Sequence, residues 1–334
     1  MHIEEQALGK AVHMAQVSII GGGNVGANAG FFIAEKGVTD VLLVDIQAGL
    51  SRGKMLDIME AAPIRRYRNF LSGSDSLDDI KGSEFVVVAA GAIRSPGMRR
   101  EELFTVNAGL IRSLAPEIAR LAPDSIVLVA TEPVDGLTAL FTQVTGMPRS
   151  RVLGLGGILD STRLRALIAR ELDVSMEIVS AMVIGRHSDD MVCLPRYCSV
   201  AGVPLPLLLP ADKVASLVEE TRTAGDLVVE LAKRSSAYYA PSAAIAELAD
   251  SIHMNLNRVF SVSLMLEGEY GLKGAALSLP ALIGYRGAAR VLTPDLTPQE
   301  LAVLHESARK ITAALKGEAA PTAVRNGATR GGTK

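Results

Sequence analysis

The sequence predicts an α/β fold in which a doubly wound parallel sheet is followed by an α+β region. From about residue 15, apolar runs with strand character alternate with stretches of helical periodicity, which is typical of a parallel sheet covered on both faces. After about residue 150 this alternation ends, and long helical patterns precede a group of extended segments. We therefore predict one domain at 15–150 and a second at 151–317, with flexible termini at 1–14 and 318–334.

The first region contains short apolar runs that we predict to be buried strands. These strands are expected at 15–20, 40–45, 84–91 and 125–130. Helical patterns separate them, and we expect helices at 26–37, 51–62 and 100–121. Because such a sheet binds ligands beyond the carboxyl ends of its strands, the strand-to-helix turns are where a site is expected.

The second region mixes helices with extended segments. Helical patterns cover 159–174, 211–234, 242–257 and 297–317. The last of these opens with Thr297 and Pro298, which favour a helix start. Two segments, 178–185 and 191–200, have the character of paired strands. An antiparallel cluster is predicted from the extended segments 261–267, 274–280 and 288–292.

Composition and charge are those of a soluble globular protein. The 334 residues are 49% hydrophobic and 21% charged, with a formal net charge of −2. The 34 basic residues are scattered, so no charge pattern favours nucleic acid or a membrane surface as a partner. No apolar run approaches the ~20 residues needed to cross a bilayer, and the first residues lack the apolar core of a secretory signal. Cys193 and Cys198 match neither a disulfide framework nor a zinc site, so we expect a cytoplasmic protein.

A glycine-rich turn follows the first predicted strand. Gly21, Gly23 and Gly26 form the spacing G-x-G-x-x-G, which lets a backbone turn tightly and approach a pyrophosphate at a helix N-terminus. The flanking strand and helix make an ordinary turn the weaker interpretation. Asp45 ends the second strand, where a carboxylate can bind ribose hydroxyls and repel a 2′-phosphate. We therefore predict a Rossmann domain that binds NAD, with Asn24 and Val25 completing the turn.

Arginines and one histidine mark a second candidate site. Arg94, Arg99 and Arg100 surround a Pro-Gly pair beyond the third strand, and a guanidinium can hold a carboxylate through two parallel hydrogen bonds. From the loop alone, a solvated basic turn is the better interpretation. His187, one of only five histidines, lies in "VIGRHSDDMVCLPR". By itself it is compatible with a surface turn.

Taken together, these motifs resemble the malate/lactate dehydrogenase family, most closely its lactate-dehydrogenase-like malate dehydrogenase branch. The matching segments occur in family order from about residue 15 to 316. They are "IIGGGNVG", "LLVDI", "RGKMLDI", "GAIRSPGMRREEL", "PVDGLT", "GGILDSTRLR", "HSDDMVCLPRYCSVAGVPL", "SAYYAPSAA" and "LEGEYGLKG". The combination is far more specific than any single motif.

The resemblance implies a role for each matching residue. His187 corresponds to the acid/base that exchanges a proton with the substrate's C2 oxygen, and Asp160 to the carboxylate that orients it. Such a carboxylate should raise the pKa of the histidine. Arg163 corresponds to the arginine that binds the C1 carboxylate, and Arg100 to the loop arginine that polarises the carbonyl. Arg94 corresponds to the arginine that binds a second carboxylate.

The implied reaction is the NAD-dependent interconversion of malate and oxaloacetate, a dicarboxylate pair. Hydride passes directly between nicotinamide and substrate, so no metal is implied. Gly91, Asn107 and Thr131 correspond to positions near the cofactor, and Ala237 to a substrate contact. The resemblance also implies a homotetramer or homodimer, in which residues 151–317 form the substrate domain.

The sequence departs from the family pattern beside the predicted site. Glu132 stands where the family usually has asparagine, Arg186 and Asp190 replace glycine and threonine, and Ser188 replaces glycine. Three explanations are open: burial keeps Glu132 protonated, Glu132 pairs with Arg186, or the active site has drifted toward another 2-hydroxy acid or away from efficient turnover. We favour the ion pair, because both residues fall at the sheet edge that faces the substrate.

Two other functions compete with malate oxidation. A lactate or other 2-hydroxy acid dehydrogenase would share the same chemistry, and Glu132 in place of the family asparagine keeps this reading open. An NAD-binding protein with a decayed active site is the alternative from another class. The set of His187, Asp160, Arg163 and Arg100 argues against decay.

Overall fold

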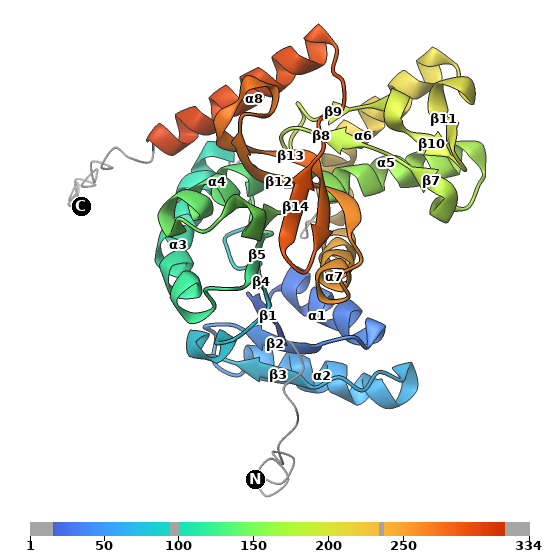
Figure 1. Ribbon diagram of the computed structural model, residues 1–334. Helices are drawn as coiled ribbons and strands as arrows, with labels where there is room; N and C mark the ends of the chain where they lie inside the picture. The colour runs from blue at the N-terminus through green and yellow to red at the C-terminus, as the bar shows by residue number, and fades with distance from the viewer. Residues whose placement is uncertain (1–15, 94–99, 234–236, 318–334) are drawn as a thin grey trace, which may run out of the picture.

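The computed structural model describes residues 16–93, 100–233 and 237–317, and a nine-stranded sheet forms its centre (Figure 1). Six strands come from the first half of the chain: β1 (Gln16–Ile20), β2 (Asp40–Val44), β3 (Leu71–Ser74), β4 (Phe85–Val88), β5 (Ile126–Val129) and β6 (Val152–Gly154). They pair in parallel in the order β3-β2-β1-β4-β5-β6. The predicted doubly wound parallel sheet is therefore confirmed.

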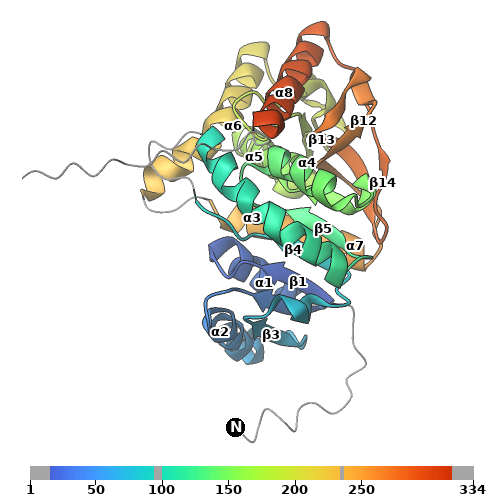
Figure 2. The ribbon, with the colours of Figure 1, turned by 90° about the vertical axis from the view of Figure 1, so that its left-hand side faces the viewer.

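Helices cover both faces of this sheet. One face carries α1 (Asn24–Lys36), α2 (Leu50–Arg65) and α7 (Tyr239–His253). The other carries α3 (Arg100–Leu121) and α4 (Val134–Thr145), which lie in front of β4 and β5 in Figure 2.

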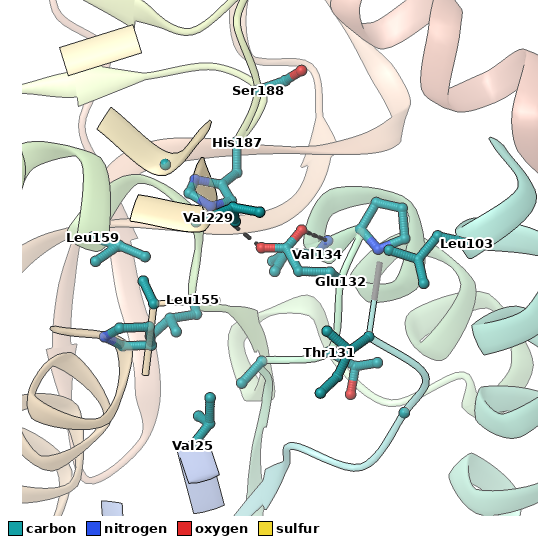
Figure 3. Close-up of a pocket in the computed structure, with 18 of the residues that line it drawn as sticks. Val25, Leu103, Thr131, Glu132, Val134, Leu155, Leu159, His187, Ser188 and Val229 are labelled. Carbon is teal, nitrogen blue, oxygen red and sulfur yellow. Dashed lines mark hydrogen bonds and ion pairs between the residues drawn. The ribbon is translucent and has the colours of Figure 1, made fainter. Parts of the chain in front are cut away.

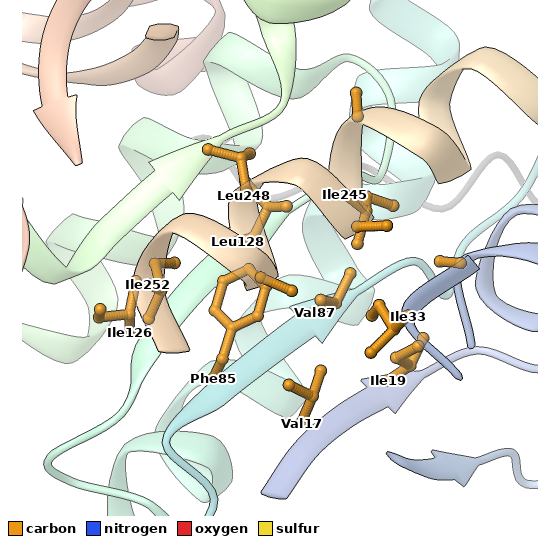
Figure 4. Close-up of a cluster of buried hydrophobic side chains, with 14 of the residues drawn as sticks. Val17, Ile19, Ile33, Phe85, Val87, Ile126, Leu128, Ile245, Leu248 and Ile252 are labelled. Carbon is orange, nitrogen blue, oxygen red and sulfur yellow. The ribbon is translucent and has the colours of Figure 1, made fainter. Parts of the chain in front are cut away.

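Strand β4 shows how the sequence produces these layers. Its consecutive side chains point to opposite faces, and all four are buried. Phe85 and Val87 pack with α1 and α7 (Figure 4), whereas Val86 and Val88 pack with α3 and α4. A strand buried on both faces therefore appears as one continuous apolar run in the sequence.

The second half of the chain extends the same sheet. Strands β12 (Arg258–Glu267), β13 (Lys273–Gly284) and β14 (Gly287–Val291) form the predicted antiparallel cluster. This cluster is not a separate sheet, because Ser263 of β12 pairs with Gly154 of β6. The remaining helices are α5 (Gly156–Leu172), α6 (Ala211–Ala232) and α8 (Pro298–Gly317).

The predicted pairing of 178–185 with 191–200 is confirmed, but as short ladders rather than long strands. β8 (Val183–Ile184) pairs with β9 (Val192–Cys193). β7 (Val179–Ser180) pairs with β10 (Ser199–Val200), which also pairs with β11 (Val203–Pro204). The turn between β8 and β9 carries the histidine of the candidate site.

Among the elements that were not predicted from the sequence are β3, β6 and α4. β3 has the sequence LSGS, without a run of apolar residues, and β6 has only three residues. α4 contains Gly136 and three threonines, which are weak helix formers. The threonine hydroxyls donate to carbonyls four residues earlier, and Leu137, Leu140 and Phe141 are buried. Tertiary packing therefore stabilises a helix that local propensity does not favour.

In the part of the chain that is described, no helix combines the length and the apolar character required to span a bilayer.

Candidate active site

A pocket of about 260 Å³ lies at the carboxyl edge of the parallel strands, between that edge and helices α5 and α6 (Figure 3). It contains residues from both halves of the chain. Those that the sequence predicted as site residues are Val25, Gly91, Thr131, Glu132, Arg163, His187 and Ala237. The strand order reverses between β1 and β4, where a doubly wound sheet binds its ligand.

The three glycines of the turn after β1 are required for different reasons. Gly21 has φ +112, and a Cβ there would lie 2.5 Å from the backbone nitrogen of Ala90 after β4. A Cβ on Gly26 would lie 2.0 Å from the carbonyl oxygen of Gly21, so only glycine lets α1 start this close to the strand. A Cβ on Gly23 would meet nothing within 4 Å, which leaves the backbone open at the helix N-terminus. The turn therefore fits a pyrophosphate.

Asp45 lies beside this turn, directly after β2. One carboxylate oxygen accepts from the Gly22 amide at 2.6 Å, and the other accepts from the Gln47 amide at 2.8 Å. Both bonds fix the carboxylate close to the glycine turn. Its position and chemistry fit the ribose hydroxyls of a dinucleotide.

His187 and Asp160 form the centre of the site. Nδ1 of His187 lies 2.7 Å from Oδ2 of Asp160. Asp160 is buried, with 1% of its surface exposed. Nη1 of Arg163 lies 3.4 Å from the other oxygen of Asp160, one turn along α5. The predicted contact of Asp160 with His187, and the shared face of Asp160 and Arg163, are therefore confirmed.

The environment of His187 favours its charged form. Burial would lower the pKa of the imidazole, but the carboxylates of Asp160 and Glu132 outweigh burial and raise the pKa well above 6.5. Oε1 of Glu132 lies 3.3 Å from Nε2 (Figure 3). The surroundings therefore favour the protonated imidazole, which is the form that can act as an acid.

The main chain around His187 is fixed by neighbouring elements. Gly185 lies two residues before His187, and strand β13 holds it through a pair of 2.8 Å hydrogen bonds with the backbone of Ser278. The His187 amide donates to Oδ2 of Asp135 at 2.7 Å. Ser263 of β12 donates to the other oxygen of Asp135 at 2.6 Å. The imidazole is thus positioned from the sheet and from α4 together.

Comparison with known proteins identifies the family. A model described as the NAD binding domain of lactate/malate dehydrogenase matches residues 15–154, and one described as the alpha/beta C-terminal domain matches residues 158–321. The chain belongs to the lactate/malate dehydrogenase family. The resemblance inferred from the sequence motifs is confirmed.

Individual members of the lactate/malate dehydrogenase family match along most of their length. The malate dehydrogenase of Desulforudis audaxviator is 39% identical over 302 residues, which cover 90% of this chain and 98% of that protein. The apo structure of Picrophilus torridus malate dehydrogenase has a TM-score of 0.87 at 35% identity, covering 92% and 98%. Lactate dehydrogenase of Cryptosporidium parvum, solved with lactic acid and nicotinamide adenine dinucleotide, has a TM-score of 0.88 at 32% identity, covering 93% and 100%.

The expected ion pair between Glu132 and Arg186 is wrong. Arg186 binds Asp190 instead, through Nε at 2.9 Å and Nη2 at 2.8 Å. Asp190 also accepts from Lys310 of α8 at 3.0 Å. Asp190 is four residues from Arg186 and reaches it in a bidentate geometry, which leaves the Glu132 carboxylate at His187. The Glu132 side chain is 48% exposed, so the structure does not support the other explanation, that burial keeps Glu132 protonated.

Other predicted residues shape the pocket through the backbone. Thr131 donates to the carbonyl of Ala90 at 2.6 Å. Asn107 is buried, and its amide nitrogen donates to the carbonyls of Ala92 at 3.2 Å and Glu132 at 2.7 Å. A Cβ on Gly91 would lie 2.5 Å from the Thr131 methyl carbon. These contacts hold the loops after β4 and β5 together.

The arginine loop is only partly described. Arg94 and Arg99 lie outside the described residues, and Arg100 begins α3. The roles predicted for their side chains therefore remain predictions.

Asp135 is the site residue that sequence reasoning missed. The motif "EPVDGLT" places an acid in the first turn of α4, where it resembles an ordinary favourable helix start. Only the fold shows that this carboxylate is buried against Ser263 and the His187 amide. Burial raises the pKa of Asp135 to about 6, although both hydrogen bonds oppose the shift.

This pKa predicts a pH-dependent contribution of Asp135 to stability. A carboxyl group whose pKa is raised on folding contributes stability at low pH, and loses it as pH rises from the unfolded to the folded pKa. The unfolding free energy of Asp135→Asn, relative to wild type, should therefore rise by about 3 kcal/mol between about pH 4 and pH 7. Urea unfolding followed by circular dichroism measures this difference.

The control is Asp124→Asn, because the Asp124 side chain is 97% exposed. Its unfolding free energy should stay close to wild type across the same range. If the difference in unfolding free energy between Asp135→Asn and wild type does not change with pH, the pKa of Asp135 is not raised on folding.

Proposed function

We infer that this chain interconverts malate and oxaloacetate with NAD as the hydride carrier. The observation that carries the inference is the His187 imidazole, paired with buried Asp160, with Nε2 directed to a pocket that also contains Arg163. The curated relatives named malate dehydrogenase, at 39–40% identity over most of the chain, favour this reaction over the lactate alternative. They also argue against a decayed site.

In this proposal His187 exchanges the proton and Asp160 stabilises the imidazolium. During reduction Nε2 donates its proton to the C2 oxygen of oxaloacetate, and during oxidation it takes the hydroxyl proton of malate. Asp160 is buried, so its charge acts on the ring with little screening by water. NAD, when bound, supplies or accepts the hydride.

Arginines bind the two carboxylates of the substrate. The Arg163 side chain is 17% exposed and lines the pocket, where it can hold the C1 carboxylate in a bidentate geometry. Arg94 is proposed to bind the second carboxylate and Arg100 to polarise the C2 carbonyl, as the sequence motif implies. Ala237 lines the same pocket and is proposed to border the substrate.

The glycine turn and the β4 and β5 loops are proposed to hold the cofactor. Gly21, Gly23 and Gly26 shape the pyrophosphate site. The other members of the proposed cofactor site are Asn24, Val25, Asp45, Gly91, Asn107 and Thr131. The division into a cofactor domain at 15–150 and a substrate domain at 151–317 belongs to the same proposal.

Oxidation of NADH in the presence of oxaloacetate, pyruvate and larger 2-oxo acids tests the reaction. We expect the highest kcat/KM with oxaloacetate. Asp160→Asn should lower kcat by roughly 10²- to 10⁴-fold, because the imidazolium loses the carboxylate that orients and stabilises it. A higher kcat/KM with pyruvate would exclude malate as the substrate, and an unchanged kcat in Asp160→Asn would exclude this role of Asp160.

The preference for NADH over NADPH is proposed to depend on Asp45. Its fixed carboxylate would face the 2′-phosphate of NADPH, and like charges placed together cost several kcal/mol. We expect kcat/KM to be roughly 100-fold higher with NADH than with NADPH, and Asp45→Ser to remove most of this difference. Equal rates with both cofactors in wild type would contradict the assignment.

We also propose a homodimer or homotetramer. Helix α2 exposes Leu56, Met59 and Ile64 by 52%, 45% and 83%, an apolar surface that an identical subunit can cover. Light scattering should give a multiple of the 35.2 kDa chain mass, and a purely monomeric mass would contradict this proposal. The free thiols Cys193 and Cys198 support a cytoplasmic location, which fractionation of the host cell would check.

A further inference from the structure

The Glu132 carboxylate occupies a defined position at the ring of His187. Oε1 lies 3.3 Å from Nε2, and Oε2 accepts from the Val134 amide at 3.4 Å, at the start of α4. The backbone oxygen of Glu132 accepts from Asn107 at 2.7 Å. Figure 3 shows the carboxylate between the imidazole and the first amide of α4. Contacts to both the carboxylate and the backbone oxygen therefore fix the position of Glu132.

We propose that Glu132 takes, in the free enzyme, the hydrogen-bonding position at Nε2 that the C2 oxygen of the substrate takes in the complex. Glu132 thereby keeps His187 protonated and biases the enzyme toward reduction of the 2-oxo acid. This inference rests on the proposed function for its direction, but the proton-holding role of Glu132 can be measured without turnover.

Hydrogen-bond chemistry explains why the arrangement holds a proton. An imidazolium donates from both ring nitrogens, whereas a neutral ring donates from only one. Asp160 lies at Nδ1 and Glu132 at Nε2, so the protonated ring satisfies both carboxylates. Loss of the proton would leave one carboxylate facing a nitrogen lone pair.

Other charges around the ring act less directly. Asp135 contacts the His187 backbone amide rather than the ring, and adds a further negative group. Arg163 opposes protonation, but its guanidinium is adjacent to Asp160. On the same loop, Arg186 is bound to Asp190.

Helix α6 contributes two more charged groups to the pocket, Arg222 and Asp226, which carry opposite signs. Of the groups in the described part of the chain, the carboxylates of Asp160 and Glu132 are those within 3.3 Å of a ring nitrogen. Among the described residues, these two carboxylates therefore act most directly on the protonation of His187.

The two directions of the reaction depend on this proton in opposite ways. Reduction needs Nε2–H, so a firmly held proton extends reduction to higher pH. Oxidation needs neutral His187: the hydroxyl proton of malate passes to Nε2 while C2 gives its hydride to NAD⁺, and the earlier proton must already have left to solvent. Glu132 should therefore shift the onset of oxidation to higher pH. Its side chain is 48% exposed and can move aside for the substrate.

The direct test is an NMR titration of ¹⁵N-histidine-labelled full-length protein without substrate. His187→Gln identifies the His187 ring signals. In Glu132→Gln, which keeps the size and removes the charge, the His187 titration midpoint should move to lower pH than in wild type. Glu132→Asn should move it in the same direction. Asp189→Asn is the matched control, because Asp189 is two residues away and its side chain is 84% exposed. Its midpoint should stay close to wild type.

Kinetics then test the consequence. At neutral pH, Glu132→Gln should raise kcat/KM for malate oxidation about tenfold for each pH unit by which the His187 titration midpoint falls, because the neutral fraction of the ring rises in that proportion. Oxaloacetate reduction by this variant should fall off at lower pH than in wild type, whereas both profiles of Asp189→Asn should match wild type. Identical His187 titrations in wild type and Glu132→Gln would overturn the proposal. If the titration shifts but wild type reduces no 2-oxo acid, the proposed function fails while the proton-holding role stands.

Discussion

The site depends on one buried ion pair, between the His187 imidazole and the Asp160 carboxylate. Removing a carboxylate from water costs several kcal/mol unless an opposite charge and further hydrogen bonds compensate. Asp160 has both, with Nδ1 of His187 at 2.7 Å and Arg163 at 3.4 Å. The same pair determines that the ring's Nε2 is the atom left to face the pocket. The proton transfer proposed at that atom would therefore follow from the way in which Asp160 is neutralised.

The continuous sheet explains how this pair is held in place. Asp160 lies on α5, directly after β6, whereas His187 lies on a turn between β8 and β9. β12 joins β6 at the edge of the parallel sheet, and β13 holds the turn through Gly185. Because the strands that support the histidine belong to the sheet that carries the glycine turn, His187 and the predicted cofactor site are held by one continuous sheet.

Local patterns predicted the parts of the structure that depend on neighbours in sequence. The strands buried on both faces, the glycine turn and the position of Asp45 after β2 all follow from a few adjacent residues. The contact of Asp160 with His187 followed from the family resemblance rather than from any local pattern. Helix α4 and the burial of Asp135 were missed because both depend on tertiary contacts: α4 packs on α3, β12 and β13, and Asp135 binds Ser263 of β12, more than 100 residues later.

The failed pairing of Glu132 with Arg186 shows a limit of reasoning from charge alone. Two unusual charges of opposite sign near one site suggested a direct pair, but Asp190 is closer to Arg186 along the chain and binds it with both oxygens. Lys310 and Ser307 of α8 bind the same carboxylate, so these charges attach the histidine turn to α8. The departures from the family pattern therefore form two independent sets. Arg186 and Asp190 fix the main chain that carries His187, whereas Glu132 acts on its ring. Within the described residues no hydrogen bond or ion pair joins Glu132 to Arg186 or Asp190, so the charge of Glu132 can change the protonation of the ring without releasing the turn that positions it.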